Sequence, residues 1–346
     1  MGTRRMRDLH QRKDVTLAMY DEREDRRQRA VERFGLTVCS RLEDALAWGP
    51  DTLVISTPPG TKGGYIKLAF ERGLHHFIEA DIWTYGAAGI ERASRQKNLV
   101  SAPSASLLHL PVVKALAAAV RDHLGSILSY QLFMATYMPG WHAGEGAEYY
   151  ARHRDTAPSR EMIPFELNWL NPIFGPASEV AGRFEKYGGL PGDTEDTWSL
   201  SMRLRTGGIG QLAITMSCPV DYRRGCCFGT GGMATWDIYS GDLAVQTAAD
   251  KTPRLQNLGA IGAVIEPMYF EEINAFIDAA QGKKTWPQSY ALSQRSTATL
   301  AAAEQSFVTG GWVEVDPDAE PATSPPRRKS PKLPCKPTSL SSNTRS

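Results

Sequence analysis

The chain has 346 residues, a formal net charge of +1, and a composition that is 42% hydrophobic and 22% charged. This length is enough for two globular domains. A net charge so close to zero gives no electrostatic case for nucleic acid or a membrane surface as a partner. No apolar run approaches the roughly 20 residues that cross a bilayer, and the basic N-terminus lacks the apolar stretch of a secretory signal. We therefore expect a cytoplasmic protein.

The cysteines support this placement. Their number is odd, no C-x-x-C motif occurs, and two of them are adjacent; they are Cys39, Cys218, Cys226, Cys227 and Cys335. This pattern argues against a disulfide framework or a zinc site and fits a reducing compartment.

Short apolar strands alternate with helices over the first hundred residues. The patterns predict helices at 3–12, 22–34, 41–49, 63–73 and 86–97, and strands at 15–20, 37–39, 51–57, 75–81 and 98–103. Such alternation is typical of parallel βαβ units, and apolar strands suit a sheet covered on both faces. We predict a Rossmann-like doubly wound parallel sheet over residues 1–105, with its first strand missing because none precedes the first helix.

The alternation of short strands and helices ends after residue 105. Longer strand patterns occupy 126–138, 178–187, 196–205, 208–217, 233–239 and 242–248, and helices are expected at 111–123, 160–174, 268–281 and 288–308. Gly-containing turns between strands indicate hairpins. Residues 106–318 are therefore predicted to form an α+β domain with a mostly antiparallel sheet, one face of which the helices at 160–174, 268–281 and 288–308 cover. The Pro-, Ser- and Lys/Arg-rich residues 319–346 are expected to be a disordered tail.

The first domain carries candidates for dinucleotide binding. Asp21 ends a predicted strand, about twenty residues after the place where a Gly-rich turn belongs, and suits the ribose hydroxyls. It favours NAD, because a 2′-phosphate would meet like charge, while Arg23 leaves NADP as the alternative. Only Gly2 stands for the glycines that let backbone approach the pyrophosphate. Either the coding start lies upstream, or the central strand and much of the pyrophosphate site have been lost.

The chain resembles the Gfo/Idh/MocA oxidoreductases, the family of glucose–fructose oxidoreductase and inositol dehydrogenase. The resemblance spans roughly residues 2–315 and rests on YDERED at 20–25, VISTPPGTK at 54–62, GLHHFIEAD at 73–81 and REMIPFELNWLNPIFG at 160–175. It implies NAD(P)-dependent hydride transfer on a sugar, cyclitol or polyol. It also implies a homo-oligomer, a dimer formed through the sheet of the second domain.

Cofactor-binding residues follow from the same resemblance. Ser56, Thr57 and Pro58 match the family turn whose backbone and Thr contact the nicotinamide side, although Lys62 stands at the usual His. Glu79 matches the Glu near the nicotinamide ribose, and Ala80 replaces the Lys that acts in proton transfer. Lys62 could replace that lysine from the neighbouring loop.

The family's Asp and His, spaced i, i+4 on one helix face, are matched by Glu161 and Phe165. A phenyl ring cannot act as a base, so the base must come from elsewhere. We take Glu161, Glu166 and His142 as the catalytic candidates, the last because it lies in a Gly- and aromatic-rich loop of the kind that lines sugar sites. Asp81, His109 and the tyrosines of AEYYARHR are further candidates.

The sequence thus supports an NAD(P)-dependent oxidoreductase, with Glu161 or His142 as the replacement base. The alternative is a non-catalytic relative that binds a nucleotide or sugar as a sensor or partner subunit, which the loss of Lys and His motivates. A truncated, non-functional product is a third reading, because an incomplete sheet exposes its edges.

Overall fold

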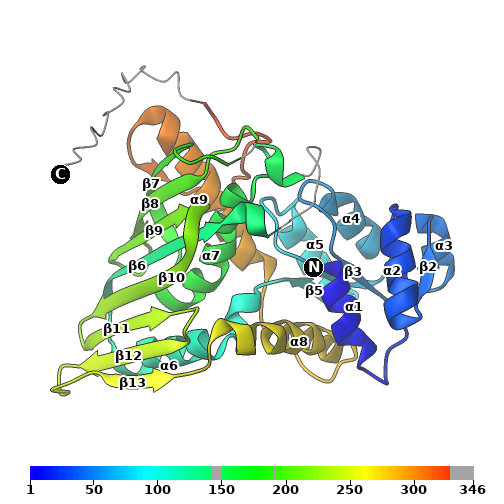
Figure 1. Cartoon of the computed structure of the whole chain (residues 1–346), viewed down its shortest axis with the longest axis horizontal. Helices are drawn as coiled ribbons and strands as arrows, with labels where there is room; N and C mark the ends of the chain where they lie inside the picture. Colours follow the sequence, from blue (N-terminus) through cyan, green and yellow to red (C-terminus); the bar gives the residue numbers. More distant parts are fainter. Residues whose placement is uncertain (142–149, 191, 328–346) are drawn as a thin grey trace, which may run out of the picture.

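The computed structural model describes residues 1–141, 150–190 and 192–327. Two lobes lie side by side (Figure 1). One carries short parallel strands among helices and holds the N-terminus, and the other is built on one large sheet with helices against it.

The N-terminal lobe follows the predicted alternation. Its helices are α1 Gly2–His10, α2 Glu24–Phe34, α3 Leu42–Ala47, α4 Lys62–Arg72 and α5 Ala87–Gln96. Its strands are β1 Ala18–Tyr20, β2 Thr37–Cys39, β3 Thr52–Ile55, β4 His75–Ile78 and β5 Ser101–Pro103. All pair in parallel, but they form two sheets, β1-β2 and β3-β4-β5, and not one. The sheet is divided between β1 and β3, where the described residues supply no strand.

The second lobe contains a nine-stranded sheet in the order β13-β12-β11-β10-β6-β9-β8-β7-β14. Its strands are β6 Ile127–Tyr137, β7 Ala177–Glu185, β8 Thr197–Leu204, β9 Ile209–Thr215, β10 Ser217–Gly229, β11 Gly232–Asp237, β12 Asp242–Thr247, β13 Arg254–Asn257 and β14 Val313–Glu314. Every pairing is antiparallel except that of β6 with β9. The mostly antiparallel sheet of the prediction is confirmed.

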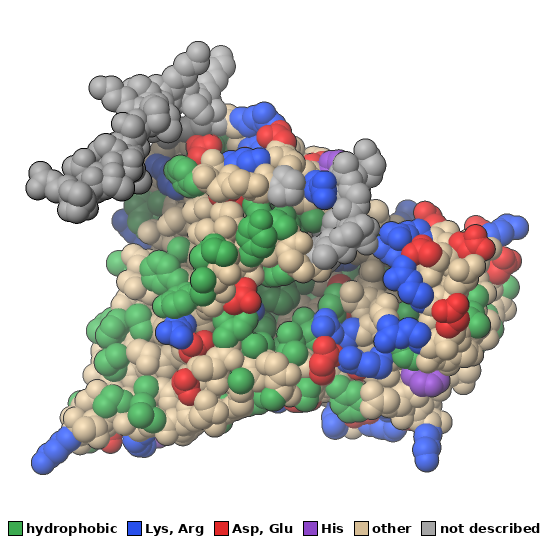
Figure 2. All heavy atoms as spheres, viewed as in Figure 1, with side chains coloured by type: hydrophobic (Ala, Val, Ile, Leu, Met, Phe, Trp, Pro, Cys, Tyr) green, Lys and Arg blue, Asp and Glu red, His purple; other side chains and the backbone are tan. Residues whose placement is uncertain are grey.

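In the part of the chain that the structure describes, the helices pack against one face of this sheet. They include α6 Pro111–His123, α7 Pro158–Phe174 and α9 Tyr290–Thr309. Short 3-10 turns precede α6 (η1 Ser106–His109), follow β6 (η2 Met138–Gly140) and precede α7 (η3 Tyr150–Arg152). The opposite face carries exposed apolar side chains, and Figure 2 shows hydrophobic side chains distributed over the large sheet.

One helix lies elsewhere than expected. α8, Ile261–Ala280, was predicted to cover the large sheet, but it packs against α1 in the N-terminal lobe. Phe276 and Ile277 of α8 share an apolar cluster with Leu9 and Phe77. The reason is that the apolar side chains of α8 pack against those of α1 and β4, which form a second hydrophobic core in the N-terminal lobe.

The tail also differs from its prediction. Residues 320–327, which we call the C-terminal strap, are hydrogen-bonded to the body and are not disordered. Trp83 Nε1 donates to the carbonyl of Pro321 at 3.0 Å, and Arg160 Nη2 donates to that of Ala322 at 2.6 Å. The composition argument missed this because backbone carbonyls, and not apolar side chains, make most of these contacts. Residues 328–346 lie outside the described part.

Gly225 in β10 is required by close packing. A Cβ placed there would lie 2.1 Å from Cζ2 of Trp236 and 2.6 Å from the carbonyl of Gln131. We expect Gly225→Ala to lower the free energy of unfolding by about 1–3 kcal/mol, because neither neighbour can retreat without disturbing the sheet. Gly64→Ala is the control: nothing lies within 4 Å of its Cβ position, and alanine favours its helix. Urea unfolding of both variants tests this; equal midpoints would contradict it.

Candidate active site

A hollow of about 710 Å³ opens between β1 and β3, and four of the cofactor candidates line it. Gly2, Asp21, Ser56 and Thr57 all line it. A Cβ on Gly2 would lie 3.7 Å from that of Ser56, so the start of α1 adjoins the end of β3. Pro58 lies one residue further along the same turn, is exposed, and does not line the hollow. Asp21 and the turn after Ile55 therefore lie at the rim of the same hollow.

Two side chains at this rim can receive a ligand. Ser56 Oγ is buried and has no hydrogen-bond partner among the described residues. Asp21 precedes α2: one carboxylate oxygen accepts from the amide of Arg23 at 2.9 Å, and the other pairs with Arg26 at 3.4 Å. A buried hydroxyl without a partner is costly, so a ligand hydrogen bond at Ser56 would be favourable.

Glu79 does not lie free beside a ribose. Its carboxylate accepts from Arg5 Nε at 2.6 Å and from Nη2 at 3.2 Å, and the same guanidinium bonds Glu272 at 2.5 Å. Burial alone would raise the pKa of Glu79, but the charge and hydrogen bonds of Arg5 outweigh it and hold that pKa below its usual value. Glu79 therefore anchors α1 and α8 to the end of β4, a role that the family pattern did not indicate.

Lys62, at the first turn of α4, is almost fully buried. Its ammonium donates to the carbonyl of Ala80 at 2.6 Å and to that of Glu79 at 3.2 Å. It also pairs with Asp81 Oδ2 at 3.4 Å. The ammonium of Lys62 thus lies next to Ala80, the position at which the resemblance leads one to expect a lysine. Lys62 itself belongs to α4, whereas Ala80 follows β4.

Glu161, in the first turn of α7, faces this cation from the second lobe. It interacts electrostatically with Lys62, Asp81 and Glu79. Burial disfavours the charged carboxylate and raises the pKa of Glu161 to about 7; Lys62 opposes this rise, and the two acidic neighbours add to it. A carboxyl group with a pKa near the working pH is suited to proton transfer.

The other acid on this helix, Glu166, does not join them. Its side chain is fully buried, forms an ion pair with Arg223, and accepts from Trp169 Nε1 at 2.7 Å. The guanidinium of Arg223 lies 5.7 Å from the ring centre of Phe165. Glu166 is thus held in the interface between α7 and the large sheet, with both oxygens engaged, and its position does not favour a role as base.

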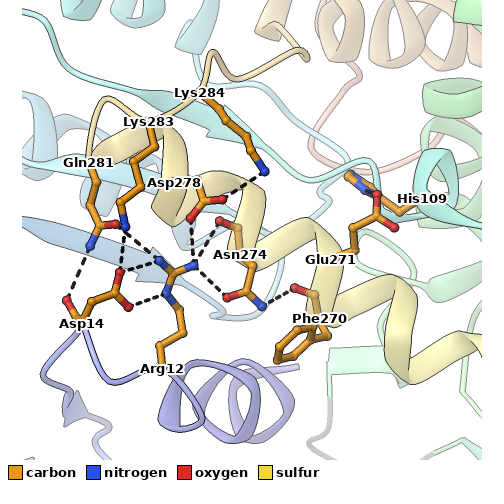
Figure 3. A network of polar contacts seen from close by, with 10 residues as sticks. All are labelled: Arg12, Asp14, His109, Phe270, Glu271, Asn274, Asp278, Gln281, Lys283 and Lys284. Carbon is orange, nitrogen blue, oxygen red and sulfur yellow. Dashed lines mark hydrogen bonds and ion pairs between the residues drawn. The ribbon is translucent and has the colours of Figure 1, made fainter.

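The remaining catalytic candidates are two histidines, the tyrosines of AEYYARHR and Asp81. His109 Nδ1 lies 3.1 Å from Oε1 of Glu271 on α8 (Figure 3). His142 and Tyr149 lie outside the described residues, and Tyr150 begins the short 3-10 turn η3. The acid Asp81 is at the cluster, where Tyr85 donates to it at 3.0 Å.

The C-terminal strap borders the same cluster. Both the amide and the hydroxyl of Thr84 donate to the carboxylate of Glu320. Thr84 also lines a small cavity of about 30 Å³ together with Asp81, Tyr85 and Asn168. Sequence reasoning missed Arg160 and Glu320, since nothing in the local pattern around either residue marks a long-range contact.

Comparisons with known proteins support the fold. No family model and no curated protein matches the chain. Among solved structures, GenD2 from gentamicin A biosynthesis, in complex with NAD, is similar with a TM-score of 0.76 and 20% identity, covering 91% of this chain and 93% of that chain. Levoglucosan dehydrogenase with NADH and levoglucosan matches with a TM-score of 0.77 and 17% identity, covering 90% and 94%.

A further similar structure is an oxidoreductase from Agrobacterium radiobacter in complex with NAD+, L-tartaric acid and magnesium. It matches with a TM-score of 0.77 and 14% identity, covering 91% of this chain and 95% of that chain. The resemblance drawn from the sequence is thus confirmed at the level of the fold. In the described ranges, no helix is long and apolar enough to span a bilayer, and no group of three or more His, Cys, Asp or Glu residues could hold a metal ion.

Proposed function

We propose that this protein is an NAD(P)-dependent oxidoreductase that takes a hydride from a hydroxyl-bearing carbon of a sugar or related polyol. The observation that carries the proposal is Glu161, a carboxyl group that interacts electrostatically with the ammonium of Lys62 and whose pKa is raised by burial to about 7. The three similar structures named above hold NAD or NADH, and two of them also hold levoglucosan or L-tartaric acid, which are small polyhydroxylated molecules.

The residues at the rim of the hollow fit a dinucleotide. Asp21 would accept hydrogen bonds from the adenosine ribose, and the unpartnered hydroxyl of Ser56 with Thr57 would contact the nicotinamide side. The positive end of α1, at Gly2, would favour the pyrophosphate. When bound, the nicotinamide ring supplies the hydride acceptor.

Proton transfer then falls to this chain's own side chains. The carboxylate of Glu161 takes the proton from the substrate hydroxyl as the carbon loses its hydride. The ammonium of Lys62 stabilises that carboxylate before the transfer, and Asp81 and the two carbonyls hold the ammonium in place. Together they take over the work that the family resemblance assigns to a Lys and a His.

The proposal is tested by incubating the purified chain with NAD or NADP and a panel of polyols. We expect reduction of the cofactor with at least one polyol, and a rate that rises with pH around 7. Calorimetry supplies an independent readout: tight cofactor binding with no turnover across the panel would instead favour the non-catalytic sensor reading.

Lys62→Met provides the sharpest check on the Glu161–Lys62 pair. Because Lys62 lowers the pKa of Glu161, its removal should move the midpoint of the kcat/KM pH profile above 7. At pH 7 the variant should therefore be slower, and it should recover at higher pH. Lys67→Met, on the exposed side of the same helix, is the control and should leave the midpoint unchanged. A Lys62→Met profile with an unmoved midpoint would contradict the pairing.

We further infer that the chain forms a homodimer through the open face of the large sheet. Several large apolar side chains are exposed in the strands of that sheet: Phe133, Tyr137, Ile209, Tyr222, Phe228 and Leu255. Exposed apolar area of this extent favours association. Light scattering should give the mass of a dimer, and Phe133→Asp should reduce it to that of a monomer.

The free cysteines of the described chain suit a reducing, cytoplasmic setting.

A further inference from the structure

The C-terminal strap contacts both lobes at the place where they meet. It follows β14 of the second lobe, and Asp318, just before it, accepts a hydrogen bond from Gln294 of α9 at 2.9 Å. Glu320 and Pro321 then contact the N-terminal lobe, and from Ala322 onward the strap contacts the second lobe again. The chain thus crosses from one lobe to the other and returns within a few residues.

On the N-terminal lobe, the loop after β4 holds the strap. The amide of the buried Thr84 donates to Glu320 Oε2 at 3.1 Å, and its hydroxyl donates to the same carboxylate. Trp83 Nε1 donates to the carbonyl of the next strap residue at 3.0 Å. Asp81, the partner of Lys62, belongs to this loop. The strap therefore holds the loop that carries part of the proposed proton-transfer cluster.

On the second lobe, the strap is held by Arg160, which directly precedes Glu161 in the first turn of α7. Its guanidinium is almost completely buried, and Nε and Nη2 donate to Glu304 of α9 at 2.6 Å and 3.0 Å. Nη2 also donates to the carbonyl of Ala322 at 2.6 Å, and Nη1 to that of Thr323 at 3.3 Å. The ion pair fixes Arg160, so the strap is fixed next to Glu161.

The two sets of contacts adjoin each other. The guanidinium of Arg160 lies 5.4 Å from the centre of the Trp83 ring, which is within the range of a cation–π contact. The strap thus joins two segments, one from each lobe, that carry Asp81 and Glu161. Proton and hydride transfer require groups from both lobes to be held in matched positions, because small misplacements greatly reduce the rate.

We propose that the C-terminal strap is a clasp that holds the loop of Asp81 against the first turn of α7, with Glu320 as its positioning residue. Glu320 acts through Thr84, so it sets the geometry of the site and is not itself catalytic. This inference rests on the proposed function, because it concerns how that site is assembled.

The ionisation of Glu161 reports on the clasp. Burial raises its pKa to about 7; Lys62 opposes this rise, and Asp81 and Glu79 add to it. These three neighbours belong to the N-terminal lobe, while Arg160, beside Glu161 on α7, is engaged in its own ion pair. A released clasp would admit water between the lobes and weaken all of these effects, so the pKa should fall towards its ordinary value of 4.5.

The test replaces Glu320 by alanine in the full chain. The residue is exposed, so Glu320→Ala leaves no cavity. Carbon-13 NMR of protein labelled at glutamate follows the ionisation of Glu161, whose signal Glu161→Gln identifies by its loss, and hydrogen exchange follows the amide of Thr84. We expect faster exchange at Thr84 and a Glu161 midpoint lowered by about one pH unit or more.

Kinetics supply a second readout. In Glu320→Ala, kcat should fall on the order of tenfold to a hundredfold. KM for the cofactor should stay unchanged, because the cofactor candidates line the separate hollow between β1 and β3. Thr84→Ser keeps both donors and should behave like the parent, whereas Thr84→Val keeps only the amide and should shift the midpoint by less. Glu314→Ala, which removes an exposed carboxylate on β14, is the control and should shift nothing.

Several results would overturn the clasp. Faster exchange at Thr84 with an unmoved Glu161 midpoint would mean that the strap binds there without positioning the site, even if the thermal midpoint fell. Unchanged exchange at Thr84, or a parent midpoint already near 4.5, would also exclude it. The NMR titration needs no turnover. A shifted midpoint in a protein that oxidises no polyol would therefore support the clasp and count against the proposed function alone.

Discussion

Glu161→Gln should reduce kcat/KM by about 10²- to 10⁴-fold, the usual contribution of a positioned base. The amide keeps the shape of the side chain but cannot accept the substrate proton. The residual rate should also lose its dependence on pH near 7, because the group that titrates there is gone. Steady-state kinetics from pH 5 to 9 provide the measurement, with Glu24→Gln, an exposed carboxylate on α2, as the control.

The same variant should be more stable than the parent protein in alkali. A carboxyl group whose pKa is raised on folding stabilises the fold fully below its ordinary value of 4.5, and this stabilisation is lost as pH rises through about 7. Gln cannot ionise, so the variant avoids this loss. The gain at pH 8 is at most about 3 kcal/mol, with solvent screening reducing it. Thermal midpoints should agree at pH 5 and diverge at pH 8. A variant that is both inactive and less stable at pH 8 would speak for a merely structural Glu161.

Arg5→Ala should destabilise the fold by about 3–5 kcal/mol, because it leaves buried carboxylates without their cation. Glu79 and Glu272 are both buried, and Arg5 donates as well to the carbonyl of Tyr269 at 3.0 Å. The loss should resist added salt, since buried pairs are poorly screened. Urea unfolding measures it.

Two further variants separate charge from packing. Arg29→Ala removes an exposed partner of Asp25 and should leave the free energy of unfolding nearly unchanged, because exposed ion pairs are screened by solvent. Arg5→Met combined with Glu79→Gln and Glu272→Gln removes the charges together and should recover much of the loss. If the triple variant were as unstable as Arg5→Ala, the penalty would come from lost packing and not from unpaired charge.

The parallel lobe could be predicted from the sequence because the hydrophobic periodicity of its helices and strands agrees with the Gly and Pro residues that end them. Asp21 and Ser56 each follow a short apolar strand, and parallel strands bring their carboxyl ends to one rim. Local pattern could not reveal that Glu79 is neutralised by Arg5, a residue on another helix. Nor could it show that the ammonium of Lys62 reaches Ala80, since that depends on how α4 packs against β4.

In the second lobe, β10 was not predicted at all. Its residues Ser217–Gly229 include Pro219 and a charged run, and its register against β6 shifts between Ser217 and Tyr222. That irregularity removes the alternation by which strands are recognised. Because Arg223 belongs to this strand, the sequence could not show that Arg223 would pair with the catalytic candidate Glu166. α8 was recognised as a helix, yet its periodicity could not tell which lobe it would cover.

The C-terminal strap has a consequence for how this chain can diverge. Arg154 and Arg160 hold it through main-chain oxygens of Ala322, Thr323, Pro325 and Pro326. Carbonyl oxygens are present whatever the side chain, so residues between the anchors can be exchanged freely while their spacing is kept. Insertions and deletions there should be selected against far more strongly than replacements. The exceptions are Glu320, whose carboxylate accepts hydrogen bonds from Thr84, and the buried Pro321 and Pro325.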